Sequence, residues 1–245
     1  MKKTLQRILK RYPTLYQPLR NVYRTFTHRP IWKHFTANEP FFFVQIGSND
    51  GLQGDAIHNI VMNNTKWRGL LVEPVPFLFE RLKNNYYRSD RFIFENVAIA
   101  PEKGVTKFYY VSESAKAELG EKLPEWFDQL GSLDRAHIFK HLPPDLNAAH
   151  LDPYIIEAEI ESLTMPDLLA RNQIETIDLL HIDTEGFDYK ILSQIDFKQY
   201  HPRVVLYEHI HLPETEKMAA ESLLKAHNYC CSPHGRFDTL ALRQW

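Results

Sequence analysis

The 245-residue sequence lacks long apolar runs, and it has only two cysteines. Its apolar runs are short ones, such as residues 41–44 and 69–72, far below the roughly 20 residues that a membrane-spanning helix needs. We therefore expect no span of a bilayer. The two cysteines, Cys230 and Cys231, are adjacent, and a disulfide between chain neighbours is strained. A secreted, disulfide-linked scaffold is therefore excluded, and a reducing cytoplasm is the expected location.

Acidic residues are absent from residues 1–38, where nine basic residues lie. The remaining chain holds 20 of the 29 Lys and Arg residues and all 31 Asp and Glu residues, so it is net acidic. We therefore expect two parts of opposite charge, a basic N-terminal arm over residues 1–38 and a domain over residues 39–245. The cations of the arm are Lys2, Lys3, Arg7, Lys10, Arg11, Arg20, Arg24, Arg29 and Lys33.

Apolar residues recur at helical spacing through the arm, which predicts a basic amphipathic helix interrupted near Pro13 and Pro18. Such an arm has three uses: peripheral contact with an anionic membrane, here the inner face; binding of an anionic partner; or packing on the acidic body. It is not a secretory signal, because no apolar stretch and cleavage site follow the charged start. Nucleic acid is not an expected partner, since the acidic body would repel phosphates.

From residue 41 onward, short apolar runs alternate with helical stretches, and this alternation predicts an α/β fold with a mostly parallel sheet covered on both faces. The expected strands are 41–46, 69–72, 92–97, 107–111, 177–182, 203–207, 229–232 and 239–242, and the expected helices are 55–63, 77–85, 165–172, one from about 187, and 214–227. Residues 112–162 lack a clean period and are rich in proline. We expect this stretch to be an inserted, partly helical segment on the substrate side, as a lid would be.

A glycine-bearing turn, Gly47-Ser-Asn-Asp-Gly51, follows the first expected strand, and Glu73 follows the second. Ligands of open parallel sheets bind beyond these carboxyl ends, and an acidic residue about 20 residues after the turn accepts ribose hydroxyls. The turn has neither the dinucleotide fingerprint nor the phosphate-loop lysine, and Asp50 would oppose a pyrophosphate. A ligand with a ribose and a positive centre, such as S-adenosylmethionine, fits better. A plain turn and a surface carboxylate are the alternative.

Carboxylates gather after two later strands, in His181-Ile-Asp-Thr-Glu-Gly186 and Glu208-His-Ile-His211. A cluster of Asp183, Glu185 and Glu208 needs a positive partner, because buried unpaired carboxylates are costly. That partner is the cationic side of a cofactor, a cationic side chain, or a divalent metal on Asp183, Glu208 and His209, although we do not expect a metal. His209 or Asp183 is the candidate general base, with Glu208 beside them. His181 and His211 are expected to be structural.

The chain resembles the FkbM-type S-adenosylmethionine-dependent methyltransferases. The resemblance rests on "FVQIGSNDG" at 43–51, "GLLVEPVP" at 69–76, "FENVAIA" at 94–100, "IDLLHIDTEGFDYKIL" at 177–192 and "VVLYEH" at 204–209, and it runs on to "DTLAL" at 238–242. The turn differs from the more common sequence of this family in having Ser48 where alanine is frequent. The arm lies outside the resemblance, and residues 112–162 are only loosely covered.

This resemblance implies a class I methyltransferase fold, with a seven-stranded sheet whose last strand is antiparallel. It also implies that the turn holds the amino-acid part of the cofactor, that Glu73 holds the ribose, and that the third strand end lies beside the adenine. With the acidic cluster, whose positive partner is then the sulfonium side of the cofactor, the candidate cofactor residues are Gly47, Ser48, Asn49, Asp50, Gly51, Glu73, Pro74, Asn96, Val97, Ala98, Asp183 and Glu185.

The expected reaction is O-methylation of a hydroxyl on a sugar or glycan-type acceptor, with contacts from the insert at Ser132, Arg135, His137 and His141. A capped surface helix is the alternative for that part of the insert. Two other functions stay open: a metal-dependent hydrolase that uses Asp183, Glu185, Glu208 and His209, and a non-catalytic methyltransferase-like module recruited through its arm. A nucleotide-sugar dehydrogenase is disfavoured by the glycine spacing.

Overall fold

The computed structural model describes residues 39–141, 146 and 148–244. The chain divides between Glu39 and Pro40 into two units, and the helices and strands of the described residues belong to the second unit. The amphipathic helix predicted for the arm lies outside the described residues and stays a prediction. Among the helices that the structure describes, none has both the length and the apolar character to cross a membrane.

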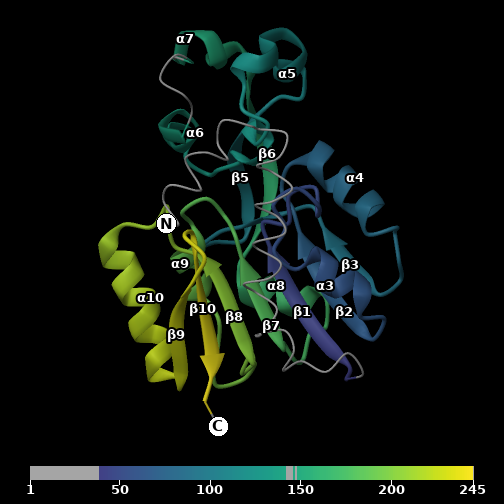
Figure 1. Cartoon of the computed structure of the whole chain (residues 1–245), viewed down its shortest axis with the longest axis vertical. Coiled ribbons are helices and arrows are strands. Elements are labelled where there is room, and N and C mark those ends of the chain that lie inside the picture. Colours follow the sequence, from purple (N-terminus) through teal and green to yellow (C-terminus); the bar gives the residue numbers. More distant parts are fainter. Residues whose placement is uncertain (1–38, 142–145, 147, 245) are drawn as a thin grey trace, which may run out of the picture. The chain divides into compact units, whose positions relative to one another are not determined.

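A seven-stranded sheet forms the centre of this unit, in the order β3-β2-β1-β7-β8-β10-β9 (Figure 1). Its strands are β1 (Phe41–Ile46), β2 (Trp67–Val72), β3 (Phe92–Glu95), β7 (Leu179–Ile182), β8 (Val204–Glu208), β9 (Tyr229–His234) and β10 (Asp238–Arg243). Neighbouring strands from β3 to β8 are parallel, whereas β10 runs antiparallel to both β8 and β9. The predicted fold class, including the antiparallel last strand, is confirmed.

Helices cover the sheet, as its apolar strands require. They are α3 (His58–Asn63), α4 (Pro76–Asn85), α8 (Met165–Arg171), α9 (Asp188–Leu192) and α10 (Glu214–Ala226). Alternate residues of β1, such as Val44 and Ile46, share one buried cluster with side chains of α8, α9 and α10. The other face carries aromatic packing, in which Phe92 contacts Phe43 and also Tyr86, directly after α4. Successive residues of β1 thus face opposite layers, as the pleat of a strand requires.

Two expectations about the strands were wrong. The run expected as one strand over 92–97 splits, because β3 ends at Glu95 while β4 (Ala98–Ile99) joins a second sheet, in the order β4-β6-β5. Within the expected insert, β6 (Ile155–Leu163) pairs along the whole of β5 (Gly104–Val111). The segment over 155–163 is therefore a regular strand, and it follows a two-residue alternation in which Ile160 and Ser162 are buried between exposed glutamates.

The rest of the insert is partly helical, as predicted, with α5 (Ser114–Leu119), α6 (Arg135–His141) and α7 (Ala148–Leu151) and with short 3-10 turns at Gly120–Lys122, Phe127–Gln129 and Asp152–Tyr154. It has its own buried cluster, which includes Val111, Leu123, Phe127 and Ile138. Figure 1 shows these helices beyond the end at which the parallel strands finish. The insert therefore stands over the edge of the sheet where a ligand would bind.

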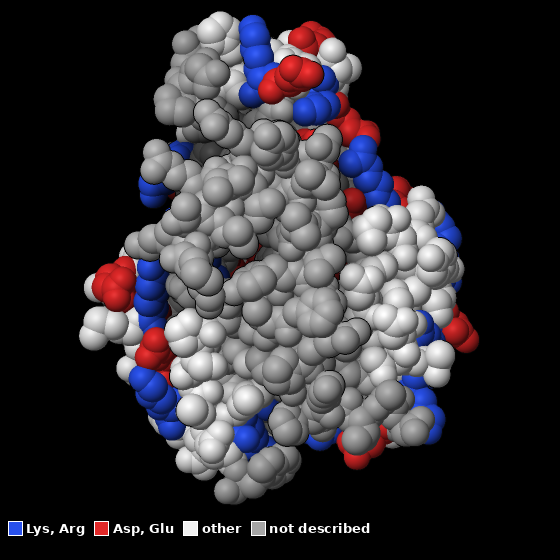
Figure 2. Space-filling view, in the orientation of Figure 1, with Lys and Arg blue, Asp and Glu red and all other residues white. Residues whose placement is uncertain are grey.

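The first helix also begins later than expected, at His58 instead of residue 55. Asp55 explains the shift, because its Oδ1 accepts hydrogen bonds from the backbone N–H groups of Ile57 (2.7 Å) and His58 (3.0 Å). An aspartate that satisfies the first N–H groups precedes a helix and does not lie inside it. On the face shown in Figure 2, the described acidic and basic side chains lie interspersed along the rim.

Candidate functional site

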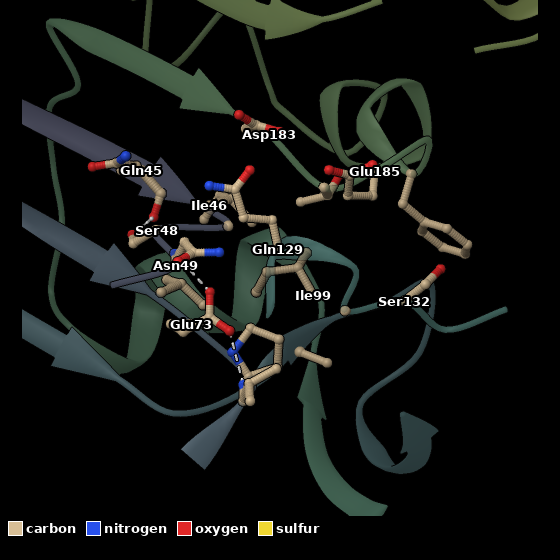
Figure 3. A pocket seen from close by; sticks show the side chains of 18 of the residues that line it. Gln45, Ile46, Ser48, Asn49, Glu73, Ile99, Gln129, Ser132, Asp183 and Glu185 are labelled. Atoms are coloured by element: carbon tan, nitrogen blue, oxygen red, sulfur yellow. Dashed lines mark hydrogen bonds between the residues drawn. The ribbon is translucent and has the colours of Figure 1, made fainter. Parts of the chain in front are cut away.

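A cavity lies where β1, β2 and β7 end, and it measures about 960 Å³ when the part open to solvent is counted. Figure 3 shows Asn49 and Glu73 on one side of it and Asp183 and Glu185 across from them. The predicted residues that line it are Gly47, Ser48, Asn49, Glu73, Pro74, Val97, Ala98, Ser132, Asp183 and Glu185. The glycine turn and the acidic end of β2 thus converge on one space.

Glu73 is 5% exposed, and its carboxylate is held by two backbone donors. The N–H of Asn49 donates to Oε2 (2.8 Å), and the N–H of Val75 donates to Oε1 (2.9 Å). Burial raises the pKa of the Glu73 carboxyl to about 7, against the opposing effect of these hydrogen bonds. Each oxygen keeps a further lone pair. The carboxylate is therefore fixed in place and can still accept two ligand hydroxyls.

Gly47 is required by packing against the neighbouring strand. Its φ is +78°, and a Cβ there would lie 1.8 Å from the carbonyl oxygen of Asp183, at the end of β7. The N–H groups of Gly47 and Ser48 both donate to the carbonyl of Val72, at 3.1 and 3.0 Å. The turn is therefore pressed between the ends of β2 and β7. This close approach places Asp183 beside the turn.

Asp50 and Gly51 shape the turn without lining the cavity. The Oδ1 of Asp50 accepts hydrogen bonds from the N–H groups of Leu52 (2.8 Å) and Gln53 (2.7 Å). A Cβ on Gly51 would lie 2.5 Å from Cδ1 of Leu82 on α4, so this glycine allows the turn to pack on that helix. The structure thus gives these two residues a supporting place next to the predicted ligand contacts.

Asn96 likewise supports the wall of the cavity from behind. Its Nδ2 donates to the carbonyl oxygens of Glu73 (2.7 Å) and Pro74 (3.0 Å), which ties the end of β3 to the end of β2. Its neighbours Val97 and Ala98 are buried and line the cavity. Of the three residues predicted beside an adenine, two therefore face the space and the third fixes the segment that carries Glu73.

The predicted acidic cluster is present, since carboxylate oxygens of Asp183, Glu185 and Glu208 lie within 4.8 Å of one another. Burial is the main cause that raises the pKa of Asp183 well above its ordinary value, and the charge of Glu185 adds to it. Burial and the charge of Asp183 raise the pKa of Glu208 to about 11. Oε2 of Glu208 is buried and has no hydrogen-bond partner among the described residues. The cluster favours a positively charged ligand.

The histidine at this cluster is His211, which was expected to be structural. Its Nε2 lies 3.3 Å from Oε2 of Glu185 and 3.7 Å from Oε1 of Glu208. The side chain of His209 instead meets the hydroxyl of Thr239, 3.0 Å from Nδ1. The structure therefore does not group His209 with Asp183 and Glu208 as a ligand set. Strand alternation fails here because β8 ends at Glu208, and the spacing of three residues between Glu208 and His211 was the signal available.

The four predicted substrate residues of the insert separate into different environments. Ser132 is buried and lines the cavity. His137 on α6 approaches Glu185, with Nε2 3.2 Å from Oε2. Arg135 is exposed and pairs with Asp152 within the insert. His141 ends α6, and its side chain lies outside the described part. Ser132 and His137 are thus at the site, and Arg135 is not.

Two buried residues of the cavity wall were not predicted as ligand contacts. Gln45 on β1 and His181 on β7 line the space, and in the described part of the chain Oε1 of Gln45 and Nδ1 of His181 have no hydrogen-bond partner. Burial lowers the pKa of His181 to about 4, so its imidazole is neutral near pH 7. Unsatisfied buried polar atoms are costly unless a ligand or water meets them. They add polar contacts to the side of the cavity between the turn and Asp183.

The sheet order, the glycine turn after β1, the acidic end of β2 and the carboxylates after β7 and β8 together define a class I methyltransferase. The residues fit S-adenosylmethionine, because the buried Glu73 carboxylate suits a ribose and the acidic cluster suits a cationic centre. A methyltransferase FkbM domain model matches residues 45–232. The chain therefore belongs to this family, as its motifs predicted, and membership implies S-adenosylmethionine as the cofactor.

Solved structures with a similar fold include the methyltransferase FkbM from Methylobacillus flagellatus, with 12% identity over 83% of this chain and 43% of that one, at a TM-score of 0.48. The Methanococcus jannaschii fibrillarin pre-rRNA processing protein matches with 9% identity over 84% and 68%, at 0.43. Precorrin-6y C5,15-methyltransferase from Geobacter metallireducens matches with 10% identity over 83% and 80%, at 0.39. This chain thus spans less than half of the FkbM structure. No curated protein sequence matches it.

Proposed function

We propose that the protein transfers the methyl group of S-adenosylmethionine to a hydroxyl of a sugar or glycan-type acceptor. The observation that carries this proposal is the pairing of two faces in one cavity, with Glu73 on one side and Asp183 and Glu185 on the other (Figure 3). The side with Glu73 suits a nucleoside, and the side with Asp183 and Glu185 suits an acceptor hydroxyl that must lose its proton. Neither the hydrolase nor the non-catalytic module gains support from the family match.

On the nucleoside side, Glu73 would accept the ribose hydroxyls, while Val97 and Ala98 form an apolar wall for the adenine. The turn over Gly47–Gly51 would contact the amino-acid part. S-adenosylmethionine supplies, when bound, a methyl group on a positively charged sulfonium. Asp183 and Glu185 offer negative charge toward that centre, and the cavity wall between the two sides orients the ligand.

On the acceptor side, a hydroxyl must lose its proton as the new C–O bond forms. Positive charge beside Asp183 favours its ionised form, and an ionised carboxylate in a buried site is a stronger base than one in water. Asp183 would therefore take the proton. Ser132 lines this space and His137 contacts Glu185 at its edge, so the insert brings two polar groups close to an acceptor with several hydroxyls.

The test is methyl transfer from labelled S-adenosylmethionine to a panel of sugars and glycans, with the methylated atom located by NMR. We expect an O-methyl ether as the product. Asp183→Asn should lower kcat about 100-fold or more, the usual range for loss of a general base, while cofactor affinity changes much less. Glu214→Gln is the matched control, because that side chain is 80% exposed on α10. Transfer to nitrogen or carbon, or a wild-type kcat for Asp183→Asn, would contradict the proposal.

The basic arm gives this enzyme a proposed location at the inner, cytoplasmic face of a membrane, with a small-molecule or glycan acceptor as its partner and no nucleic acid. The support is the charge separation between residues 1–38 and the acidic remainder. Binding to anionic vesicles that weakens as salt is added would support it, and equal binding to neutral vesicles would not.

A further inference from the structure

Three side chains from separate segments meet at the mouth of the acidic cluster. His137 comes from α6 of the insert, Glu185 from the loop after β7, and His211 from the loop after β8. One ring nitrogen of each histidine and a carboxylate oxygen of Glu185 all lie within 4.8 Å of one another. The two imidazole rings are edge to face, with centroids 5.4 Å apart.

The spacing of the donor atoms fits ligands around a metal ion. Nε2 of His137 and Nε2 of His211 lie 3.2 and 3.3 Å from the same oxygen, Oε2 of Glu185. Zinc bonds of about 2.0–2.2 Å at tetrahedral angles place neighbouring donor atoms roughly 3.3–3.5 Å apart. A charge-assisted hydrogen bond is shorter, at about 2.7–2.9 Å. The two observed distances are at the long end of the hydrogen-bond range and match the spacing of donor atoms around a shared ion.

The backbone at Glu185 and Gly186 is left-handed, and it runs directly beside both histidines. Glu185 has a φ of +53°, and Gly186 follows with +98°. A Cβ on Gly186 would lie 3.5 Å from Cβ of His211 and 3.8 Å from Cε1 of His137. A larger side chain at this position would therefore fill the space beside the two rings. The left-handed conformation of Glu185 is costly for a residue other than glycine, and such costs concentrate at functional sites.

The surroundings bring two further carboxyl groups to this point. Asp183 and Glu208 adjoin Glu185. Oε1 of Glu208 lies 3.7 Å from Nε2 of His211, and its buried Oε2 has no hydrogen-bond partner in the described chain. A divalent cation at this point would offset the cost of keeping the carboxylates close together.

We propose that His137, Glu185 and His211 bind one divalent transition-metal ion, with Glu208 as the adjoining carboxylate. Two imidazoles and a carboxylate are the donor set of Zn²⁺ and of other first-row dications. This set differs from the one considered from the sequence, which was Asp183, Glu208 and His209. The metal would also fasten the insert to the sheet at the cavity.

What the metal does there rests on the proposed function. A hydroxyl bound to a divalent ion loses its proton more readily than one in water, because the ion stabilises the alkoxide. The alkoxide oxygen then forms the bond to the methyl carbon as the bond from that carbon to sulfur breaks, and the proton passes to Asp183. No oxidant or reductant is consumed.

The test is titration of the tag-free, chelator-treated full-length protein with Co²⁺ and with Zn²⁺. Co²⁺ binding is followed by its visible d–d absorption and Zn²⁺ binding by calorimetry. We expect one ion per chain, with at least tenfold weaker binding in His137→Gln and His211→Gln. His150→Gln is the control, because His150 is an exposed histidine of the same insert outside the cluster. Far-UV circular dichroism and S-adenosylmethionine affinity show whether each variant is folded.

Equal metal affinity in the wild type and in both folded cluster variants would overturn the site, as would the absence of any one-to-one binding. If a cluster variant fails to fold, a metal-induced rise in the unfolding temperature of the wild type, reversed by chelator and also seen in His150→Gln, carries the same test. One-to-one metal binding without any methyl transfer would contradict the proposed function and leave the metal site supported. Methyl transfer by a protein that binds no metal would contradict the metal site and leave the proposed function supported.

Discussion

At the scale of single residues, Glu73 combines two properties that oppose each other. Its burial and its two backbone donors hold the carboxylate toward the cavity, yet burial also makes the ionised form unfavourable in the ligand-free protein. A ribose that donates hydrogen bonds to Glu73 would stabilise the ionised form that the empty fold disfavours. The residue is therefore suited to binding at the expense of stability, as functional residues often are.

The pH dependence of stability follows from this raised pKa. Because the folded-state pKa of about 7 lies above the ordinary value of 4.5, the contribution of Glu73 to the free energy of unfolding is fully present below about pH 4.5 and is lost as pH rises through 7. We expect the cofactor-free wild type to lose more stability between pH 5 and pH 8 than Glu73→Gln, by about 1–3 kcal/mol. Urea unfolding at both pH values measures it.

That experiment is read from the change in the free energy of unfolding between pH 5 and pH 8, and not from its value at either pH. A glutamine amide would set its NH₂ group against one of the two backbone donors, so Glu73→Gln is destabilised at every pH. Burial also raises the pKa of Asp188 to about 7, so part of the wild-type slope remains in the variant. Equal slopes for the two proteins would contradict the assignment of a raised pKa to Glu73.

Gly47 gives a second test at the residue scale, with Gly235 as its matched control. The two glycines have nearly the same φ, +78° and +74°, but only Gly47 has a neighbour in the way of a Cβ. Gly235→Ala should cost about 1–2 kcal/mol for the left-handed backbone alone. Gly47→Ala should cost at least about 3 kcal/mol, because the Asp183 carbonyl must also move. Denaturant unfolding measures the stability of both variants. Similar losses of stability would contradict the close contact between Gly47 and the Asp183 carbonyl.

Single residues differ in how far the sequence alone could place them. Glu73 was predicted because its position depends only on following a strand, and Gly47 because it begins a turn. His211 was not, because its place depends on how the chain turns after β8 ends, which strand alternation does not describe. His209 was chosen as a candidate base because an imidazole titrates near neutral pH, and the structure places its side chain against Thr239.

At the scale of elements, the parallel strands and their helices were predictable because each has a regular period and a clear end. The second sheet was not, since β6 pairs with β5 across a long separation in sequence, and only a few large apolar residues mark the buried face of β6. The split of the third strand also had no local signal. Tertiary pairing decided both, as it often does for strands.

The insert should unfold separately from the main sheet, because it has its own buried cluster. Ile138 on α6 is fully buried there, and removal of a buried isoleucine side chain costs about 2–5 kcal/mol. Ile138→Ala should therefore speed hydrogen exchange of amides within the described parts of 111–154 while leaving β1 and β7 protected. Arg135→Ala, which loses an exposed ion pair with Asp152 and a cation–π contact with Phe139, should change little. Faster exchange throughout the domain would show a single cooperative unit.

At the scale of the whole molecule, the chain joins a family fold, a cavity at the ends of its parallel strands, and a basic arm of opposite charge. The fold and family could be predicted because several motifs occur in the right order at the ends of strands. The acceptor could not, since no periodicity in the sequence fixes where the side chains of the insert lie. The use of the arm stays a prediction, because it lies outside the described residues.

The most direct test of the central claim is calorimetric titration of the full-length protein with S-adenosylmethionine, compared with Glu73→Ala and with Glu214→Ala as the exposed control. We predict one site per chain in the wild type and the control. Affinity should fall about 100-fold in Glu73→Ala, as expected for the loss of two hydrogen bonds to a charged group. Undiminished affinity in a folded Glu73→Ala variant, or no binding by the wild type, would contradict the account.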